Sequence, residues 1–335
     1  MKLNAKLLLT ILCLVLAVFS GACGDDDDDD NDTGEGNDDV DDDLNDDVDD
    51  DADDDTDDAD DDTVDDIDDD IDDDADDDVD DDCDAPLYPD VLVTGHRGAT
   101  AYAPENTIPT IEKAFELGAF AVEIDVRHTS DGEYVLMHDD TVDRTTDGSG
   151  LVSDMTLEEI KALTIRTLNP NYPDLQVPTL AEALEAINNA GGQVDMDMKT
   201  GEPEGAIQVV VDMDLEDICF VYSSSVDKLD RVRSVSTEVR IQPPSSSVSD
   251  TQFLLDYFDP DPEHIELSSG GLTPANVELI KSTGAVVFMD ALGVRDVMFI
   301  LGLDWGWKNM MEMGVEIIQT DMPGLLLEYR DNLCE

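Results

Sequence analysis

Two histidines and a pair of acidic residues form the part of this sequence best suited to chemistry. His96 follows one short apolar run, and His138 ends another. Between them, Glu123 and Asp125 lie two residues apart in a third apolar run, so both side chains point to the same side of an extended strand. Histidines that transfer protons, beside carboxylates that hold a cation, are the groups needed for metal-assisted acid–base chemistry on a phosphate ester.

The acidic pair predicts a metal site. Glu123 and Asp125 would place two like charges in one buried strand, which is costly unless a cation neutralises them. Carboxylate oxygens suit hard divalent ions. We therefore expect one divalent cation, Mg²⁺ or Ca²⁺, as the cofactor.

Several short motifs around these residues resemble the glycerophosphodiester phosphodiesterase family. The resemblance covers roughly Leu87 to Arg330 and is most specific in its first part. It implies a phosphodiesterase with a TIM-barrel fold that hydrolyses glycerophosphodiesters to glycerol 3-phosphate and an alcohol. The motifs are His96-Arg97-Gly98, Pro104-Glu105-Asn106-Thr107, Glu123-x-Asp125 and His138-Asp139, with weaker matches at Asp195-Met196-Asp197-Met198-Lys199 and Thr320-Asp321-Met322-Pro323.

The resemblance also implies roles for single residues. His96 and His138 would be the catalytic pair, and we take His96 as the base and His138 as the acid. The attacking group would be the substrate's own glycerol hydroxyl, which gives a cyclic phosphate that water then opens. A third metal ligand is implied at Asp197, while Arg97 and Lys199 would bind the substrate and neutralise its phosphodiester oxygens.

The sequence departs from the family at two strand ends. The family has Glu where this chain has Asp197, which is one methylene shorter, so Asp195 on the same side of the strand is an alternative ligand. The family's Trp-Thr-Val-Asn-like ending reads Phe288-Met289-Asp290-Ala291 here, and the extra carboxylate would change the pocket for the polar group. Trp305 and Trp307 come later on a helical pattern, which favours packing or rim positions.

Other polar residues near the motifs are expected to support the site. For Glu105 and Asn106 we favour capping the next helix and bracing the His96 loop over substrate contact. His128, three residues after Asp125, would lie in a loop or behind the ligands. His264 has no motif around it and is assigned no role.

Alternating strand and helix patterns fill the last 251 residues, Ala85–Glu335, close to the ~250 typical of a (β/α)8 TIM barrel. An excursion after the second strand occupies Tyr134–Val177. An open doubly wound sheet is the alternative fold, which no Gly-x-Gly-x-x-Gly motif supports. The expected strands are Val91–Thr94, Ala121–Val126, Val194–Met198, Ile218–Tyr222, Val239–Gln242, His264–Leu267, Ala285–Met289 and Glu316–Gln319. The expected helices are Thr107–Leu117, Thr179–Ala190, Pro203–Asp214, Val226–Ser234, Asp250–Phe258, Thr273–Ser282 and Val294–Met313.

The first 23 residues predict a targeting segment. Lys2 and Lys6 precede the apolar stretch Leu7–Phe19, which is shorter than the ~20 residues of a spanning helix. Small residues before Cys23 resemble a bacterial lipoprotein cleavage site, although Ser20 replaces the usual Leu. We expect lipidation at Cys23 and a bacterial, exported, membrane-anchored lipoprotein, periplasmic or on the cell surface; ordinary secretory cleavage is the alternative.

Residues 24–84 form a low-complexity segment with 40 Asp, 1 Glu and no Lys or Arg. Such a segment cannot bury enough apolar surface to order itself, so we expect a disordered tether stretched by its own charge. Low-affinity Ca²⁺ binding by the clustered carboxylates is the alternative. The remaining mature chain still carries about 30 excess negative charges, counted as 45 acidic against 15 basic residues, which excludes nucleic-acid binding.

Three cysteines remain beyond Cys13 and Cys23. Cys219 lies in an apolar run and is expected in the core. Cys83 and Cys334 flank the predicted barrel in an oxidising compartment, which favours a disulfide between them.

The sequence is consistent with three hypotheses about function. The first is a metal-dependent glycerophosphodiesterase tethered to a membrane only by its lipid anchor. The second is the same barrel acting, in a phospholipase D-like manner, on sphingomyelin or lysophospholipids, which would need exposed apolar residues around the site. The third is a non-catalytic surface lipoprotein that binds cations or ligands. No sequence feature specifies an oligomeric state.

Overall fold

The computed structural model describes residues 85–303 and 305–334. The predicted signal segment, the lipidation site Cys23, the tether of residues 24–84 and Cys83 lie outside the described residues. Within the described residues, no helix is both long and apolar enough to cross a membrane.

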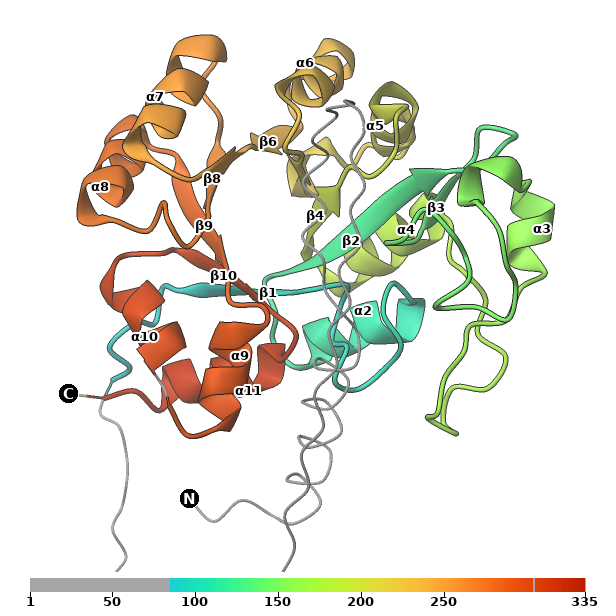
Figure 1. The fold of residues 1–335 in the computed structure, drawn as a ribbon, viewed down its shortest axis with the longest axis horizontal. Helices are drawn as coiled ribbons and strands as arrows, with labels where there is room; N and C mark the ends of the chain where they lie inside the picture. The colour runs from blue at the N-terminus through green and yellow to red at the C-terminus, as the bar shows by residue number, and fades with distance from the viewer. Residues whose placement is uncertain (1–84, 304, 335) are drawn as a thin grey trace, which may run out of the picture. The chain divides into compact units, whose positions relative to one another are not determined.

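Parallel strands form a ring with helices on its outside (Figure 1), which confirms the predicted TIM barrel. The sheet order is β6-β5-β4-β2-β1-β10-β9-β8-β7. β6 pairs with β5, β7 pairs with β8, and only Pro243 separates β6 from β7, so these two short strands share one barrel position and give eight positions in all. The bounds are β1 (Leu92–Gly95), β2 (Ala121–His128), β4 (Gln193–Asp197), β5 (Cys219–Tyr222), β6 (Arg240–Gln242), β7 (Pro244–Ser245), β8 (His264–Leu267), β9 (Val286–Asp290) and β10 (Ile317–Thr320).

The helices follow the sequence signals closely. At the start of α4, Thr179 and Glu182 form a capping box, and Gly191 ends the helix with φ of 72°. The bounds are α2 (Ile108–Glu116), α4 (Leu180–Ala190), α5 (Pro203–Asp212), α6 (Val226–Val235), α7 (Val248–Tyr257), α8 (Pro274–Thr283), α9 (Val294–Ile300), α10 (Trp305–Glu312) and α11 (Pro323–Asp331).

One helix prediction was wrong, and one helix of the barrel was missed. The expected helix Val294–Met313 is divided into α9 and α10, because the chain turns at Gly302, which has φ of 78° and donates its N–H to Phe299. The last helix, α11, was not predicted. It begins at Pro323, whose fixed φ suits the first helical position.

The excursion after β2 brings His138 to the barrel. Its first strand, β3 (Tyr134–Leu136), runs antiparallel to the end of β2, and Met137 N donates to Asp125 O at 3.0 Å. The 3₁₀ turn η1 (Val152–Asp154) and helix α3 (Leu157–Lys161) follow. The excursion has a small core of its own, formed by Val135, Met137, Val142, Val152, Ile160, Ile165 and Val177.

The barrel interior changes from apolar to acidic along its axis. Ala121, Phe220, Phe288 and Ile317 form an apolar cluster at the amino end of the strands. Two residues further along each of three strands, the inward positions are polar: Glu123 on β2, Asp290 on β9 and Gln319 on β10. The fold therefore gathers acidic groups towards the carboxyl ends of the strands, where barrel enzymes place their sites.

Candidate active site

The loop after β1 holds His96 and Arg97 in a tight turn. His96 N donates to Thr320 O at 3.0 Å, and Arg97 has a positive φ of 52°. Gly98 has φ of 94°, and a Cβ there would lie 2.4 Å from Thr110 Cγ2, so only glycine fits. This turn points the Arg97 backbone N–H at the barrel interior, where it donates to Glu123 Oε2 at 2.7 Å.

Glu123, Asp125 and Asp197 form the predicted acidic cluster. Each offers a carboxylate oxygen, and these oxygens all lie within 4.8 Å of one another. Burial raises the pKa of Glu123 well above its ordinary range, and the charges of Asp125 and Asp197 raise it further. A divalent cation would remove this cost, so the oxygen donors, their spacing and their burial fit such an ion.

Two basic side chains lie over the same carboxylates. Lys199 Nζ is 2.8 Å from Asp197 Oδ2 and 3.8 Å from Asp125 Oδ1. Arg97 Nε is 3.3 Å from Asp125 Oδ2. The structure thus places Arg97 and Lys199, both predicted from the motifs, where local positive charge faces an otherwise acidic interior.

His96 is held by a carboxylate from the other end of the chain. Its Nδ1 lies 2.8 Å from Asp321 Oδ1. Because a carboxylate only accepts hydrogen bonds, Nδ1 carries the proton and Nε2 is left for another partner. Asp321 follows β10, and its backbone N–H donates to the buried Asp296 at 3.1 Å. Asp321 belongs to the Thr320-Asp321-Met322-Pro323 motif, but the sequence alone predicted no role for it.

His138 has a similar arrangement. Its Nδ1 lies 2.8 Å from Asp139 Oδ1, and its backbone carbonyl accepts two hydrogen bonds from Arg127, at 3.0 and 2.6 Å. Burial disfavours the charge of Asp139, but hydrogen bonds from Arg144 and His138 lower its pKa to about 2. Each predicted catalytic histidine therefore has an ionised carboxylate on Nδ1.

Comparison with known proteins adds to this geometry. Residues 96–325, which include both histidines, the acidic cluster and Asp321, match the Glycerophosphoryl diester phosphodiesterase family. The chain belongs to this family. The match covers more than two thirds of the chain and confirms the resemblance in the sequence motifs.

Curated relatives of the family match the chain over shorter stretches. A glycerophosphodiester phosphodiesterase of Caldanaerobacter subterraneus is 45% identical over 111 residues, which are 33% of this chain and 46% of that protein. Human glycerophosphodiester phosphodiesterase 1 is 43% identical over 124 residues, 36% of this chain and 37% of that protein. The matched region thus spans less than half of either relative.

Solved structures of family members match nearly the whole barrel. The glycerophosphodiester phosphodiesterase of Agrobacterium tumefaciens has a TM-score of 0.61 and 25% identity, covering 71% of this chain and 99% of that one. A phosphodiesterase from Oleispira antarctica, in complex with the product sn-glycerol-3-phosphate, has a TM-score of 0.61 and 26% identity over 71% and 95%.

The two residues expected to support the site contact it directly. Asn106 Nδ2 donates to Asp125 Oδ2 at 2.7 Å and its Oδ1 accepts from Asp125 N at 3.2 Å. Glu105 accepts from Arg97 and Arg144. The predicted capping role was wrong: Thr107 is the N-cap of α2 and makes no side-chain cap hydrogen bond. Bracing of the His96 loop is observed, because Asn106 N donates to Arg97 O.

The alternative ligand Asp195 is not one of the three clustered residues Glu123, Asp125 and Asp197. It is buried, in register with Glu123 across the β2–β4 pair, it accepts from Gln242 Nε2 at 3.2 Å, and burial raises its pKa. Asp290 is the extra carboxylate at the strand end where this chain differs from the family. It is half-buried and accepts a hydrogen bond from Gln319 Nε2 at 3.1 Å.

The remaining histidines lie outside this arrangement. His128 ends β2, and its Nδ1 is 2.7 Å from Thr200 Oγ1. His264 packs edge-on against Phe220, and burial lowers its pKa to about 3, so it stays neutral. Trp307 is buried and stacks on Phe299, which agrees with its predicted packing role.

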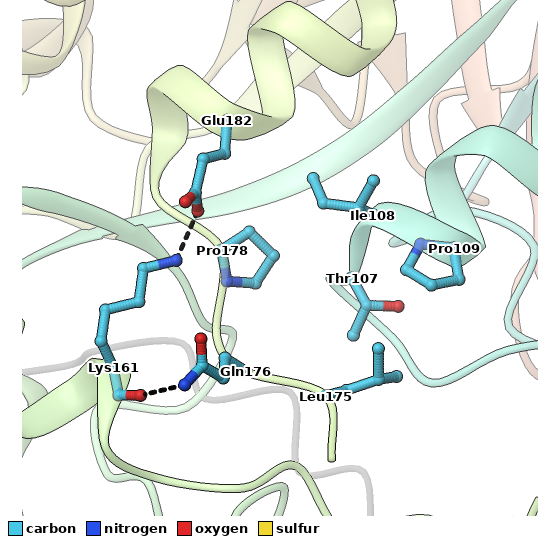
Figure 2. Close-up of a pocket in the computed structure, with 8 residues that line it drawn as sticks. All are labelled: Thr107, Ile108, Pro109, Lys161, Leu175, Gln176, Pro178 and Glu182. Atoms are coloured by element: carbon cyan, nitrogen blue, oxygen red, sulfur yellow. Dashed lines mark hydrogen bonds and ion pairs between the residues drawn. The ribbon is translucent and has the colours of Figure 1, made fainter. Parts of the chain in front are cut away.

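A separate hollow of about 340 Å³ lies outside the barrel, between α2, α4 and the excursion (Figure 2). Ile108, Leu175 and Pro178 give it apolar walls, and Lys161 is paired with Glu182 at its edge. Neither candidate histidine, His96 or His138, and none of the three clustered carboxylates lines it. It is therefore distinct from the site at the strand ends.

Proposed function

We propose that this chain hydrolyses glycerophosphodiesters to glycerol 3-phosphate and an alcohol, with one divalent cation, Mg²⁺ or Ca²⁺, at Glu123, Asp125 and Asp197. The observation that carries the proposal is the pairing of each candidate histidine with a carboxylate through Nδ1, beside the acidic cluster. Family membership supports it, as does the product named for the Oleispira structure.

The histidines would divide the proton transfers. His96 Nε2 takes the proton of the attacking glycerol hydroxyl, and His138 Nε2 gives a proton to the leaving alcohol as its P–O bond breaks. The resulting cyclic phosphate is opened by water, with the two histidines exchanging roles. Arg97 and Lys199 offset the charge that develops on the non-bridging oxygens. A bound divalent cation would supply Lewis-acid polarisation of a phosphoryl oxygen.

The predicted location remains part of the proposal. A lipid on Cys23 would attach the protein to a bacterial membrane after export, and residues 24–84 would act as an acidic spacer. The active barrel would then meet water-soluble diesters near a membrane without entering it. Metabolic labelling with a fatty-acid analogue, lost in Cys23→Ala, would test the anchor.

A second substrate class is favoured by one specific observation. The segments that follow β1, β2 and β9 expose apolar side chains: Tyr102, Leu168 and Val294, the first residue of α9, with Leu301 and Leu303 between α9 and α10. These segments begin at the carboxyl ends of the strands, where an acyl chain would pass if lysophospholipids or sphingomyelin were substrates. The same two histidines would act on either class of diester.

The test compares both classes on one preparation of the mature chain. Choline or ethanolamine release is measured from glycerophosphocholine, glycerophosphoethanolamine and lysophosphatidylcholine, with EDTA and after addition of Mg²⁺ or Ca²⁺. We expect metal-dependent release from the two glycerophosphodiesters, lost in His96→Ala and Glu123→Ala. Release from lysophosphatidylcholine alone would favour the second class, and release from none of the three would leave only a binding role.

A further inference from the structure

We propose that Arg144, contributed by the excursion, is a positioning residue that holds His138 and Arg97 in their working orientations at once. The kinetic part of this inference rests on the proposed function, while the geometric part does not. Neither the family motifs quoted above nor the roles derived so far include Arg144.

The Arg144 guanidinium bridges two carboxylates. Its Nε and Nη2 donate to Asp139, at 2.7 Å to Oδ2 and 3.0 Å to Oδ1. Its Nη1 and Nη2 donate to Glu105, at 2.7 Å to Oε2 and 2.8 Å to Oε1. Both contacts are bidentate. The planar guanidinium of arginine is the only common side-chain group that can make two bidentate contacts with carboxylates.

Each of these carboxylates also binds a residue with a predicted role in the reaction, His138 in catalysis and Arg97 in substrate binding. Asp139 Oδ1 lies 2.8 Å from His138 Nδ1, and Glu105 Oε1 accepts from Arg97 Nη1 at 3.0 Å. A continuous series of charged contacts therefore runs from one catalytic histidine, through Arg144, to the arginine above Asp125. Arg144 lies at its midpoint, and its own hydrogen bonds go to the two carboxylates, Asp139 and Glu105.

Arg144 also keeps the two carboxylates ionised. Burial disfavours the charge of Glu105, yet hydrogen bonds and charge from Arg144 and Arg97 lower its pKa to about 2. Without Arg144, Glu105 and Asp139 would face each other as like charges, and each would keep only one partner, Arg97 for Glu105 and His138 for Asp139. His138 would then lose the fixed acceptor that defines its tautomer.

The excursion fixes the backbone on both sides of Arg144. Thr146 donates twice to Val142 O, from its N–H and its hydroxyl, and Arg166 N donates to Thr145 O at 2.8 Å. Val142 is fully buried in the excursion's own core. The excursion thus has a function beyond delivering His138: it presents the arginine that orders both sides of the site.

The experiment compares Arg144→Gln, Arg144→Lys and the control Arg166→Gln. Arg166 lies on the same excursion and is exposed, and its guanidinium donates to the carbonyl of Asp143 rather than to a site carboxylate. We expect Arg144→Gln to lower kcat/KM about 10–100-fold, the range seen when the partners of working residues are removed. Arg144→Lys should recover only part of this loss, and Arg166→Gln should stay within about 3-fold of wild type.

A double-mutant comparison separates positioning from general damage. In a Glu105→Gln/Asp139→Asn background, Arg144→Gln should add little further loss, because its partners are already gone. An equal fractional loss in both backgrounds would overturn the proposal, as would an equal loss in Arg166→Gln.

A second readout needs no substrate. The chain has 4 histidines, so their side-chain signals can be followed by ¹H–¹⁵N NMR. We expect Arg144→Gln to shift or broaden the His138 signal while those of His128 and His264 stay unchanged. An unchanged His138 signal would refute the positioning role even if wild type proved inactive on every substrate tried, and inactivity with a shifted signal would count only against the proposed function.

Discussion

His96 Nδ1 lies 2.8 Å from Asp321 Oδ1, although 225 residues separate them in the chain. Pairing of β1 with β10 brings them together, since Gly95 at the end of β1 is in register with Thr320 at the end of β10. The candidate base is therefore completed only when the first and last barrel strands meet.

This pair makes the first prediction. Asp321→Asn keeps the shape but can donate its amide to Nδ1, which moves the imidazole proton to Nε2 and blocks that nitrogen as a base. We expect kcat to fall about 10²–10⁴-fold, the range attributed to one general acid or base. The Thr100 hydroxyl lies 3.4 Å from the same oxygen, so Thr100→Val is the control and should lose little. Equal activity of Asp321→Asn and wild type would contradict the role of Asp321.

The acidic cluster gives a prediction about pH. Burial, then Asp125 and Asp197, raise the pKa of Glu123 in the folded protein, so the folded state binds its proton more tightly than the unfolded state. Its stabilising contribution is full below the unfolded pKa and is lost as pH rises towards the folded one. In EDTA, Glu123→Gln should therefore gain stability relative to wild type between pH 5 and pH 8, while losing metal-dependent hydrolysis.

Urea unfolding at several pH values measures this difference. Because the amide oxygen can still accept from Arg97 N, the comparison isolates the charge. Added Mg²⁺ or Ca²⁺ should stabilise wild type at pH 8 far more than the variant. If the difference in unfolding free energy between wild type and Glu123→Gln stays constant across this pH range, ionised Glu123 does not destabilise the fold.

Much of this site could be predicted from sequence because its parts are local. Glu123 and Asp125 share a strand face by the two-residue period of a strand, and His96 and His138 each end an apolar run. The β-branched, Gly-bounded runs also predicted the barrel strands to within about two residues.

The parts that could not be predicted depend on contacts across the chain or on side-chain reach. Asp321 acquires a partner only through β1–β10 pairing, and Arg144 lies in an irregular segment without any periodic signal. The division of the expected helix at Gly302 likewise follows from a local turn, whereas a single glycine inside a helical pattern is often tolerated.

A third prediction concerns the two ends of the barrel. Leu87 N donates to Leu333 O at 2.8 Å, so the chain beside Cys334 runs next to the start of the described barrel. This favours the proposed Cys83–Cys334 disulfide. Cys83→Ser should lower the free energy of unfolding by about 2–4 kcal/mol under oxidising conditions. The peptides that contain Cys83 and Cys334 should show a mass shift on reduction. Cys219 is buried and free, so Cys219→Ser should leave that shift unchanged. Reduction that leaves stability unchanged would argue against the bond.

The last prediction concerns Asp296, whose carboxylate accepts a hydrogen bond from the backbone N–H of Asp321. It is buried and accepts from Trp307 Nε1 at 2.9 Å, from the Thr320 hydroxyl at 2.9 Å and from Asp321 N at 3.1 Å. Asp296→Leu leaves these three donors without an acceptor, at about 1–3 kcal/mol each, so we expect a loss of at least about 3 kcal/mol in urea unfolding. Trp307→Phe removes one of these three donors, and the lost hydrogen bond should lower the free energy of unfolding by about 1 kcal/mol.

The pH dependence of that loss distinguishes Asp296 from an ordinary packing residue. Burial, and then the charge of Asp321, raise the pKa of Asp296 to about 7, so wild type loses part of its stability as pH rises from about 4 to about 7. The deficit of Asp296→Leu should therefore be largest near pH 4 and shrink towards pH 7. A deficit that instead grows with pH would mean that the ionised carboxylate is fully compensated by its three donors, and that burial does not control its charge.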